Sequence, residues 1–476
     1  MKSRTMILLA GATPAAILGC IAMTPTMAAM DTGTLYTPDS SGTLATITTN
    51  GRIDTNNPFF KSLGTNGRAC VTCHQPAEAW SVTPAGLMAR FNATHGMDPA
   101  FRLNDGANSP LADVSTEGAR RSAYSMLLNK GLIRVGIGIP ANAEFALAAV
   151  EDPYGYASAS ELSLFRRPLP STNLRFVTGV MWDGRETHGA FAVGDPSTAH
   201  QTLVDSLSSQ AIDATNGHAQ ASVPPSATQV QQIVDFELGL STAQASDNAA
   251  GWLNEQGAAG GAEFLESANF YVGINDTLGA DPNHQPFDPT AMTLFTAWDH
   301  PRRNGRNRDG RTEEAQAAIA RGQRLFNLKS FDITGVGGLN DALSAPVIRG
   351  TCTTCHNAPN VGSHSVTLPL NIGLTDASRR TRDMPLYTLR NTRVGDPDFG
   401  ETLRTTDPGR ALITGKWRDI GKFKGPVLRG LAGRAPYFHN GLARDLEMAV
   451  EFYDSRFHIG LTPQERADLA AFLRSL

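Results

Sequence analysis

The chain has 476 residues, which is too long for one ordinary hydrophobic core, so two or three domains are expected. Charged residues make up 18% of it, and 46 glycines and 28 prolines indicate a loop-rich globular protein and exclude a disordered one. The net charge is −4 and no long basic run occurs, so we expect no nucleic-acid partner.

The first residues have the layout of a secretory signal peptide. Basic residues at 2–4 precede an apolar run at 6–23, and small residues follow at 26–29. Glycine and proline interrupt the run, which favours a cleaved signal over a membrane-spanning helix, and no other segment is apolar enough to span a bilayer. We expect residues 1–29 to be removed and the mature protein to reside in the periplasm without spanning the membrane. A lipoprotein signal at Cys20 is the alternative.

The four remaining cysteines form two matching motifs, CVTCH at 70–74 and CTTCH at 352–356. Two thiols at this spacing can add to the two vinyl groups of one porphyrin, and the histidine that follows can bind the iron. Disulfides, a redox CxxC or a four-cysteine zinc site would account for the cysteines, but not for a histidine at the same place twice. The sequence therefore predicts two covalently bound haem c groups. The attaching residues are Cys70, Cys73, Cys352 and Cys355, and the iron ligands are His74 and His356.

Helical periodicity predicts helices at 226–244, at 312–326 and from Pro463 to the end of the chain, where Thr462 can cap the helix. The sheet signal is slight, because only residues 131–150 alternate like a short hairpin. We predict a mainly α protein of two cytochrome c-like haem domains with long loops, insertions and little β structure. The predicted units are the signal peptide 1–29, an N-terminal haem domain with an insertion at 30–250, a connector at 251–311 and a C-terminal haem domain at 312–476.

Around these motifs the sequence resembles the bacterial di-haem cytochrome c peroxidases and their relative MauG. The shared segments are LSLFRRPLPSTNLRF…MWDGRE within 162–186, the second CxxCH region, and FKGPVLRGLAGRAPYFHNG…LTPQERADLAAFLRSL within 423–476. They occur in the family order around both haem motifs. Because Cys70 and Cys352 lie farther apart than in the compact peroxidases, the chain resembles the longer, MauG-like members.

The resemblance implies roles for two aromatic residues. Trp182 matches the tryptophan that relays electrons between the two haems, and a merely packed aromatic is the alternative. Tyr453 stands fourteen residues after His439, where the peroxidases have methionine and MauG has tyrosine, which implies a His/Tyr-ligated C-terminal haem. A helix capped by Asp445 would also turn Met448 away from the Tyr453 face. A packed tyrosine, with His439 or another residue on the iron, stays open.

The resemblance further implies that peroxide meets the N-terminal haem, beside a glutamine and, ten residues later, a glutamate. Gln210 fits the first position, but Gln220 stands at the second. An amide can orient peroxide, but it cannot exchange a proton near neutral pH. His218 is the candidate substitute base, with an ordinary surface or structural histidine as an equal alternative, and Glu186 is a weaker candidate.

A calcium ion between the domains is also implied, bound partly by backbone carbonyls of a Thr-x-Pro triplet. Here the triplet reads Arg434-Ala435-Pro436, and carbonyl ligation tolerates the change. Arg434 and Pro436 are therefore the expected carbonyl ligands. Asn104 or Asn108 is the expected side-chain ligand, although the segment that holds both would equally form a turn.

Three functions stay open on this evidence. In the first, hydrogen peroxide reacts at the N-terminal haem, Trp182 shares the oxidising equivalents with the C-terminal haem, and electrons come from a small redox protein or a protein substrate. The second is a di-haem oxygenase that uses O2, which would tolerate the missing glutamate. The third is an electron carrier without enzymatic activity, which requires a distal ligand such as His95 to close the first haem site.

Overall fold

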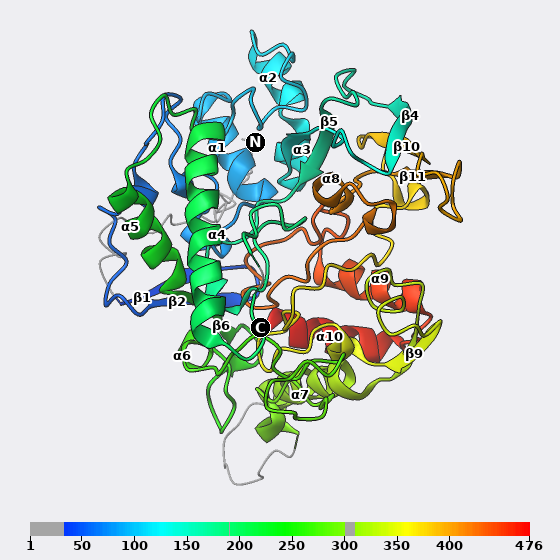
Figure 1. Ribbon diagram of the computed structural model, residues 1–476. Coiled ribbons are helices and arrows are strands. Elements are labelled where there is room, and N and C mark those ends of the chain that lie inside the picture. The colour runs from blue at the N-terminus through cyan, green and yellow to red at the C-terminus, as the bar shows by residue number, and fades with distance from the viewer. Residues whose placement is uncertain (1–32, 190, 300–309) are drawn as a thin grey trace, which may run out of the picture.

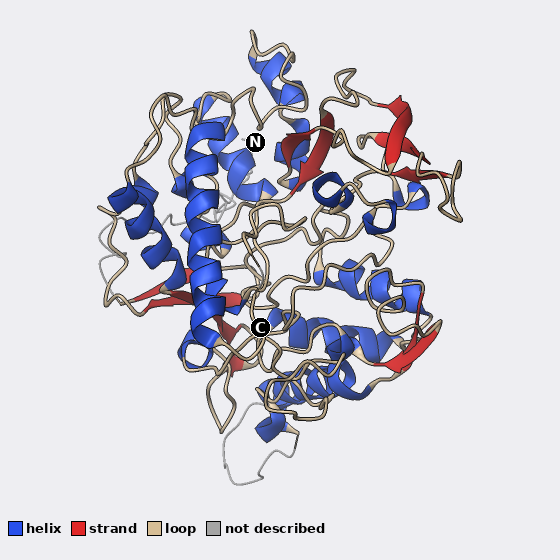
Figure 2. Ribbon diagram, viewed as in Figure 1, coloured by secondary structure: helices blue, strands red, loops and turns tan. Residues whose placement is uncertain are grey.

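The computed structural model describes residues 33–189, 191–299 and 310–476, and the predicted signal peptide lies outside them. Within the described part, helix accounts for 31% and strand for 16% of the residues, and the strands form four antiparallel sheets (Figure 2). The prediction of a mainly α fold with little β structure was therefore wrong. The strands are short, and partners such as Gly42–Thr48 and Leu240–Asp247 lie far apart in the sequence, so local periodicity does not reveal them.

The first half of the chain packs helices beside a four-stranded sheet of order β1-β2-β6-β7 (Figure 1). The strands of this sheet are β1 (Thr34–Pro38), β2 (Gly42–Thr48), β6 (Leu240–Asp247) and β7 (Gly251–Trp252). The helices are α1 (Pro84–Thr94), α2 (Glu117–Ala123), α3 (Ser125–Lys130), α4 (Pro196–Gly217) and α5 (Ala227–Leu238). Helices α4 and α5 pack together over a core of apolar side chains that extends to the first CxxCH motif.

Two predicted elements differ from the structure. The helix expected at 226–244 ends at Leu238, because the following segment pairs with β2 as strand β6. The hairpin expected at 131–150 does not form. Its two halves are strands, but β3 (Ile133–Ile137) pairs with β5 (Leu162–Arg166), whereas β4 (Phe145–Glu151) joins a sheet of the second half.

The second half of the chain is built on α7 (Gly310–Leu328), α9 (Leu446–Phe457) and α10 (Pro463–Arg474). The predicted helices at 312–326 and at the C-terminus correspond to α7 and α10, and Thr462 caps α10 as expected. Its hydroxyl accepts a hydrogen bond from the Glu465 amide at 3.2 Å. The remaining elements are α6 (Ala262–Glu266), α8 (Ala411–Thr414), β8 (Phe331–Thr334), β9 (Val347–Gly350), β10 (Leu386–Asn391) and β11 (Thr402–Thr405).

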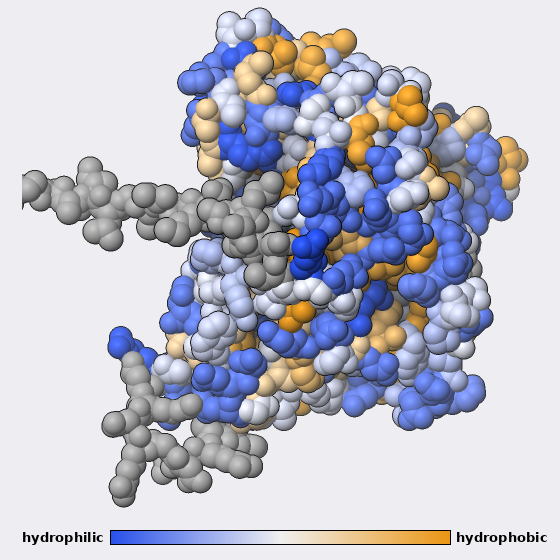
Figure 3. Space-filling model, turned by 90° about the vertical axis from the view of Figure 1, so that its left-hand side faces the viewer, coloured by the Kyte–Doolittle hydropathy of each residue, from blue (hydrophilic) through white to orange (hydrophobic). Residues whose placement is uncertain are grey.

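The described part of the segment predicted as a connector packs against the second half of the chain. Its apolar residues, including Leu253, Met292, Phe295 and Trp298, share one core with α7 and α10. Every helix in the described ranges is too short or too polar to cross a lipid bilayer. On the face drawn in Figure 3, apolar side chains are scattered among hydrophilic ones.

Candidate functional site

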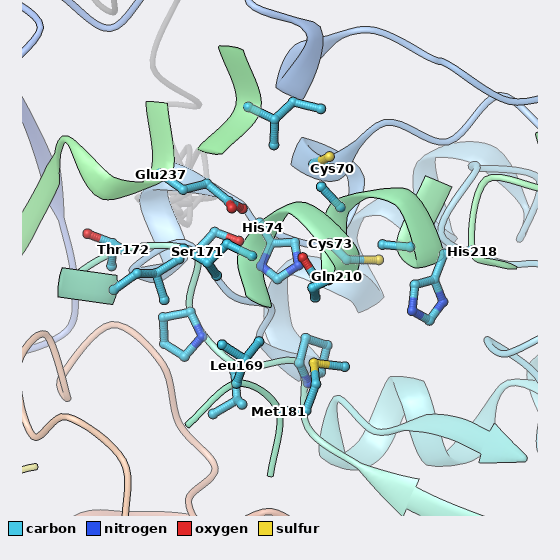
Figure 4. A pocket seen from close by; sticks show the side chains of 18 of the residues that line it. Cys70, Cys73, His74, Leu169, Ser171, Thr172, Met181, Gln210, His218 and Glu237 are labelled. Atoms are coloured by element: carbon cyan, nitrogen blue, oxygen red, sulfur yellow. The ribbon is translucent and has the colours of Figure 1, made fainter. Parts of the chain in front are cut away.

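Two cavities adjoin each other, one at each CxxCH motif. They share wall residues from two segments of the chain, namely Pro168, Pro170, Lys424, Pro426 and Arg434. The space not filled by protein atoms, part of it open to solvent, is about 1510 Å³ in the first cavity and about 1710 Å³ in the second. Figure 4 shows the first cavity.

The two CxxCH motifs adopt the same local structure. Each begins with a single 3₁₀ turn, Cys70–Thr72 or Cys352–Thr354. In each motif the histidine amide donates to the carbonyl of the first cysteine, at 3.0 Å for His74 and 3.1 Å for His356. A threonine hydroxyl within each turn also accepts a backbone amide at its start. The turn thus points both thiols and the imidazole of one motif into one cavity (Figure 4).

Both motif histidines are held in the tautomer that suits iron ligation. Nδ1 of His74 donates to the Trp80 carbonyl at 3.1 Å, and Nδ1 of His356 donates to the Gly362 carbonyl at 2.7 Å. Nε2 of each ring is therefore the unprotonated nitrogen and is available to a metal. Burial lowers the pKa of His74 to about 4 and also lowers the pKa of His356, which keeps both rings neutral.

The four cysteines carry free thiols, and burial raises the pKa of Cys70, Cys352 and Cys355 to about 12. Uncharged, buried thiols are poor thiolate ligands and poor redox nucleophiles. The two pairs line different cavities, and no cluster of three or more histidine, cysteine or acidic side chains that could hold a metal ion occurs in the described ranges. A single four-cysteine zinc site is thereby excluded.

Buried positive charge provides an independent test of whether haem fits. Lys424, Arg429 and Arg434 line the cavities, and within the described residues none of them forms an ion pair with a carboxylate. Burial lowers their pKa values to about 8, 9 and 10, respectively. Nε of Arg429 and Nε of Arg434 have no hydrogen-bond partner. Buried cations require compensating negative charge, so these cavities suit a cofactor that carries carboxylates, as the haem propionates do.

The second cavity contains Tyr453 together with three histidines. Tyr453 lies on α9, and its ring centroid is 6.5 Å from that of His356. Burial raises the pKa of its phenol. His439 is stacked on Phe423 at 3.9 Å, and neither of its ring nitrogens has a hydrogen-bond partner. His364 donates from Nδ1 to the Cys355 carbonyl at 3.0 Å. Tyr453 and His439 thus both remain available as a second ligand.

Helix α9 itself is set by its cap. The Asp445 carboxylate accepts a hydrogen bond from the Met448 amide at 2.8 Å, as expected for the helix start. Leu446, Val450 and Tyr453 all line the second cavity, whereas Met448 is absent from its wall. The helical spacing thus presents the tyrosine to the cavity in place of the methionine.

Trp182 lies in the wall of the second cavity, and the preceding residue, Met181, lies in the wall of the first. The indole Nε1 donates to the Arg167 carbonyl at 2.8 Å, and the ring contacts His439 edge-on with centroids 6.1 Å apart. The next residue, Asp183, is fully buried and ion-paired with Arg166. The loop that carries the tryptophan is thereby fixed between the two cavities.

The residues predicted beside the first haem are only partly brought together. Gln210, on α4, and His218, at its C-terminal end, line the first cavity. Gln220 is exposed, and Glu186 does not line the cavity. His95, suggested as a closing ligand, has a side chain that is 71% exposed, and it pairs with Glu117 outside the cavity.

His218 is held by a buried ion pair. Its Nδ1 is hydrogen-bonded to the Asp105 carboxylate, which also pairs with Arg68. These two contacts hold the pKa of Asp105 below its usual value despite burial. A carboxylate can only accept, so Nδ1 is the donor and Nε2 is the nitrogen free to accept a proton.

Sequence reasoning missed two residues of the first cavity, Glu237 and Met181. Glu237 is 5% exposed, and one of its carboxylate oxygens has no partner (Figure 4). Burial raises its pKa to about 7. The sequence could have revealed Glu237, because it lies on the same helical face as Val230 and Val234, where an apolar residue is expected. Nothing in the sequence singled out Met181.

The residues expected to bind calcium are only partly engaged in other contacts. The Arg434 carbonyl accepts a hydrogen bond from the Arg167 guanidinium at 3.0 Å. The Asn104 amide nitrogen donates to the carbonyls at the end of α4, whereas its Oδ1 is buried without a hydrogen-bond partner. The Asn108 side chain bonds to residues of α2 and α3. Pro436 lies in the wall of the second cavity.

Comparison with known proteins supports the resemblance stated from the motifs. The chain is 31% identical over 195 residues to cytochrome-c peroxidase IdrP1 of Denitromonas iodatirespirans, a match that covers 35% of this chain and 50% of the relative. It is 33% identical over 140 residues to IdrP2 of the same organism, covering 27% of this chain and 36% of that protein. The chain therefore spans about half, or less, of the length of these curated relatives. No protein-family model matches the chain.

Among solved structures, a MauG-like protein associated with microbial copper homeostasis matches with 16% identity and a TM-score of 0.32, covering 67% of this chain and 76% of the other. The resemblance to the bacterial cytochrome c peroxidases is thus confirmed at the level of sequence.

Proposed function

We propose that this chain, which resembles the cytochrome c peroxidases, is an exported di-haem oxidoreductase that reduces hydrogen peroxide. One observation carries the proposal: two adjoining cavities each hold a Cys-x-x-Cys-His motif whose histidine keeps Nε2 free. Removal of residues 1–29, a periplasmic location and haem domains at 30–250 and 312–476, joined through 251–311, belong to the same proposal.

Each haem would be attached to the two cysteines of its motif, would be ligated by His74 or His356, and would supply a redox-active iron. Tyr453 is the proposed second ligand in the second cavity, since a phenolate favours an oxidised metal. The first cavity has no tyrosine in its described wall, and we propose that peroxide binds there.

Gln210 and His218 are the proposed contacts for peroxide. The Gln210 amide can both donate to and accept from peroxide oxygens. His218 is oriented by Asp105, so its Nε2 can take a proton from one peroxide oxygen and return it to the other as the O–O bond breaks. The His218 side chain is 40% exposed, which allows the proton to exchange with solvent. Gln220, exposed outside the cavity, has no part in this proposal.

Trp182 is the proposed relay between the two haems. Its indole lies at the second cavity, directly after a residue of the first, and an aromatic ring shortens the gap that an electron must cross. Reduction of one peroxide to two waters consumes two electrons and two protons. The electrons would come from a small redox protein or from a protein substrate that is itself oxidised.

A stopped-flow titration of the fully oxidised, two-haem protein with one equivalent of hydrogen peroxide tests the proposal. Haem content is first measured by alkaline pyridine spectra, which should give two haem c per chain. Rapid optical change at both haems without prior reduction is the expected result. A protein that ignores peroxide in its oxidised and its half-reduced state, yet forms a stable adduct with O2 when reduced, would support the oxygenase. One that binds neither would support the electron carrier.

A further inference from the structure

Arg167 lies at the junction between the two cavities and is almost completely buried, with 4% of its surface exposed. It follows strand β5 directly in the sequence. Its guanidinium contacts four backbone carbonyls from three separate segments of the chain. The acceptors are Val82 at 2.6 Å, Arg434 at 3.0 Å, Lys130 at 3.2 Å and Gly131 at 3.5 Å.

These carbonyls form a cluster of negative dipoles that a cation must neutralise, because buried carbonyls without partners cost free energy. Carbonyl oxygens are also among the ligands that bind calcium in proteins. One of the four, the Arg434 carbonyl, is the oxygen for which the sequence predicted a calcium ion. In this chain the guanidinium already supplies the positive charge. In the described ranges, no carboxylate lies within ion-pair distance of Arg167. The positive charge of its guanidinium is therefore balanced by the dipoles of the carbonyls to which it donates hydrogen bonds.

A calcium ion at this cluster would also meet like charge. The Arg434 side chain is buried beside Arg167, and its positive charge acts on the Arg167 guanidinium. Glu78 and Tyr437 act on the Arg167 guanidinium in the opposite sense. A dication would therefore have to displace one guanidinium and tolerate another.

The backbone of Arg167 connects this cluster to the proposed electron relay. Its carbonyl accepts the indole N–H of Trp182 at 2.8 Å, and its amide donates to the His439 carbonyl at 2.7 Å. The next residues, Pro168 and Pro170, belong to the wall shared by both cavities. Anything that fixes the Arg167 side chain therefore fixes the hydrogen-bond acceptor of the tryptophan.

We propose that the guanidinium of Arg167 replaces the calcium ion expected from the resemblance, and that Arg167 is the positioning residue that holds Trp182 between the two haems without a metal. The second part deepens the proposed function, since it assumes that Trp182 relays electrons. The first part concerns only the metal content of the protein, so it does not depend on electron transfer through Trp182.

The metal part is tested on the wild-type two-haem protein by elemental analysis before and after treatment with EGTA. The expected result is far less than one calcium per chain, with optical spectra and unfolding temperature unchanged by EGTA and by added calcium. One calcium per chain, whose removal by EGTA changes the haem spectra or lowers the unfolding temperature, would overturn the proposal. The calcium content and the effects of EGTA are measured without peroxide, so they test the metal proposal even if the protein is not a peroxidase.

The positioning part is tested with Arg167→Ala and Arg167→Lys, each as the two-haem protein. The readout is the rate at which an electron moves between the haems after photoreduction of one of them. We expect Arg167→Ala to slow this rate several-fold, because a displaced indole lengthens the path that the electron crosses between the haems. Millimolar guanidinium should restore the rate by refilling the carbonyl cluster. If Arg167→Ala does not yield protein, Arg167→Lys gives the same comparison, because one ammonium cannot span four carbonyls.

Arg175→Ala is the matched control. Arg175 is less deeply buried than Arg167, but it also donates to backbone carbonyls, those of Leu265 and Glu266, and it lines neither cavity. Its replacement should lower stability without slowing electron movement, and guanidinium should have no effect on the rate. An inter-haem rate that is unchanged in both Arg167 variants, or slowed equally in the control, would contradict a positioning role.

Discussion

At the scale of single residues, we propose that the phenol oxygen of Tyr453 sets the chemistry of the second cavity. The cavity also contains His439, whose two ring nitrogens have no partners, and His364, whose Nε2 has none, so geometry leaves three side chains that can complete the iron coordination. A phenolate is a hard anion and lowers the reduction potential of iron, whereas a thioether raises it. Tyr453→Met should therefore raise the potential of the second haem in a spectroelectrochemical titration.

Tyr437→Phe is the control for that variant. Tyr437 lines the same cavity, but its hydroxyl donates to the Leu431 carbonyl at 2.9 Å and so is already engaged. Its loss should cost about 1 kcal/mol of unfolding free energy and leave the potential unchanged. If Tyr453→Met leaves the potential where it was while His439→Ala shifts it, His439 is the ligand.

We expect Glu237, in the wall of the first cavity, to make the stability of the protein depend on pH. Burial raises its pKa from 4.5 to about 7, so the folded protein binds a proton that the unfolded chain has already lost. The associated stability is fully present below about pH 4.5 and is lost as pH rises to about 7, and it amounts to at most about 3 kcal/mol. Glu237→Gln should flatten this slope in urea unfolding curves recorded from pH 4.5 to 8. Equal slopes in the variant and the wild type would show that Glu237 ionises normally.

Site residues that form a motif of sequence neighbours could be predicted, whereas those that depend on contacts between distant segments could not. The cysteines and histidines of the two motifs are neighbours in sequence, and their chemistry follows from spacing alone. Gln220 was expected near the first haem by counting along the chain, but the end of α4 turns it to the surface. Arg167 could not be recognised, because its role depends on carbonyls contributed by residues 82, 130, 131 and 434.

At the scale of elements, helices were easier to anticipate than strands. A helix buries one face of a continuous segment, so α7 and α10 could be read from apolar spacing and from the capping residue Thr462. A strand needs a partner, and β2 finds its partner β6 across almost the whole N-terminal half. The helix predicted at 226–244 was therefore too long, because the residues from Leu240 onward form strand β6.

The packing of α7 against α10 depends on one glycine. A Cβ atom added to Gly322 would overlap the Asp468 carbonyl and the Phe472 side chain of α10. Gly322→Ala should lower the unfolding free energy by about 1–3 kcal/mol, as overpacking does, although alanine favours helix. Gly310→Ala, at the start of the same helix with open space around it, should be neutral or slightly stabilising. A neutral Gly322→Ala in thermal unfolding would mean that the two helices can separate at little cost.

At the scale of the whole molecule, the two halves meet at the walls of the cavities. Arg166 links them through a buried network, since it pairs with Asp183 of the WDGR segment and with Asp407 of the second half at 2.7 Å. Residues 168–170 and 424–426 then supply the shared wall. The arrangement brings the two proposed haem sites close together while each keeps its own motif, which is the geometry that electron sharing requires.

Trp182→Phe tests whether that geometry is used. Phenylalanine keeps an aromatic ring in the wall, but it loses the indole N–H bonded to the Arg167 carbonyl and is much harder to oxidise. The two haem spectra should stay intact, whereas the peroxide-driven change at the second haem should lag behind that at the first in stopped-flow traces. Trp417→Phe, outside both cavities, is the control and should behave as wild type. Simultaneous changes at both haems in Trp182→Phe would mean that electrons cross the shared wall without the indole, and residues 424–426 would become the next to examine.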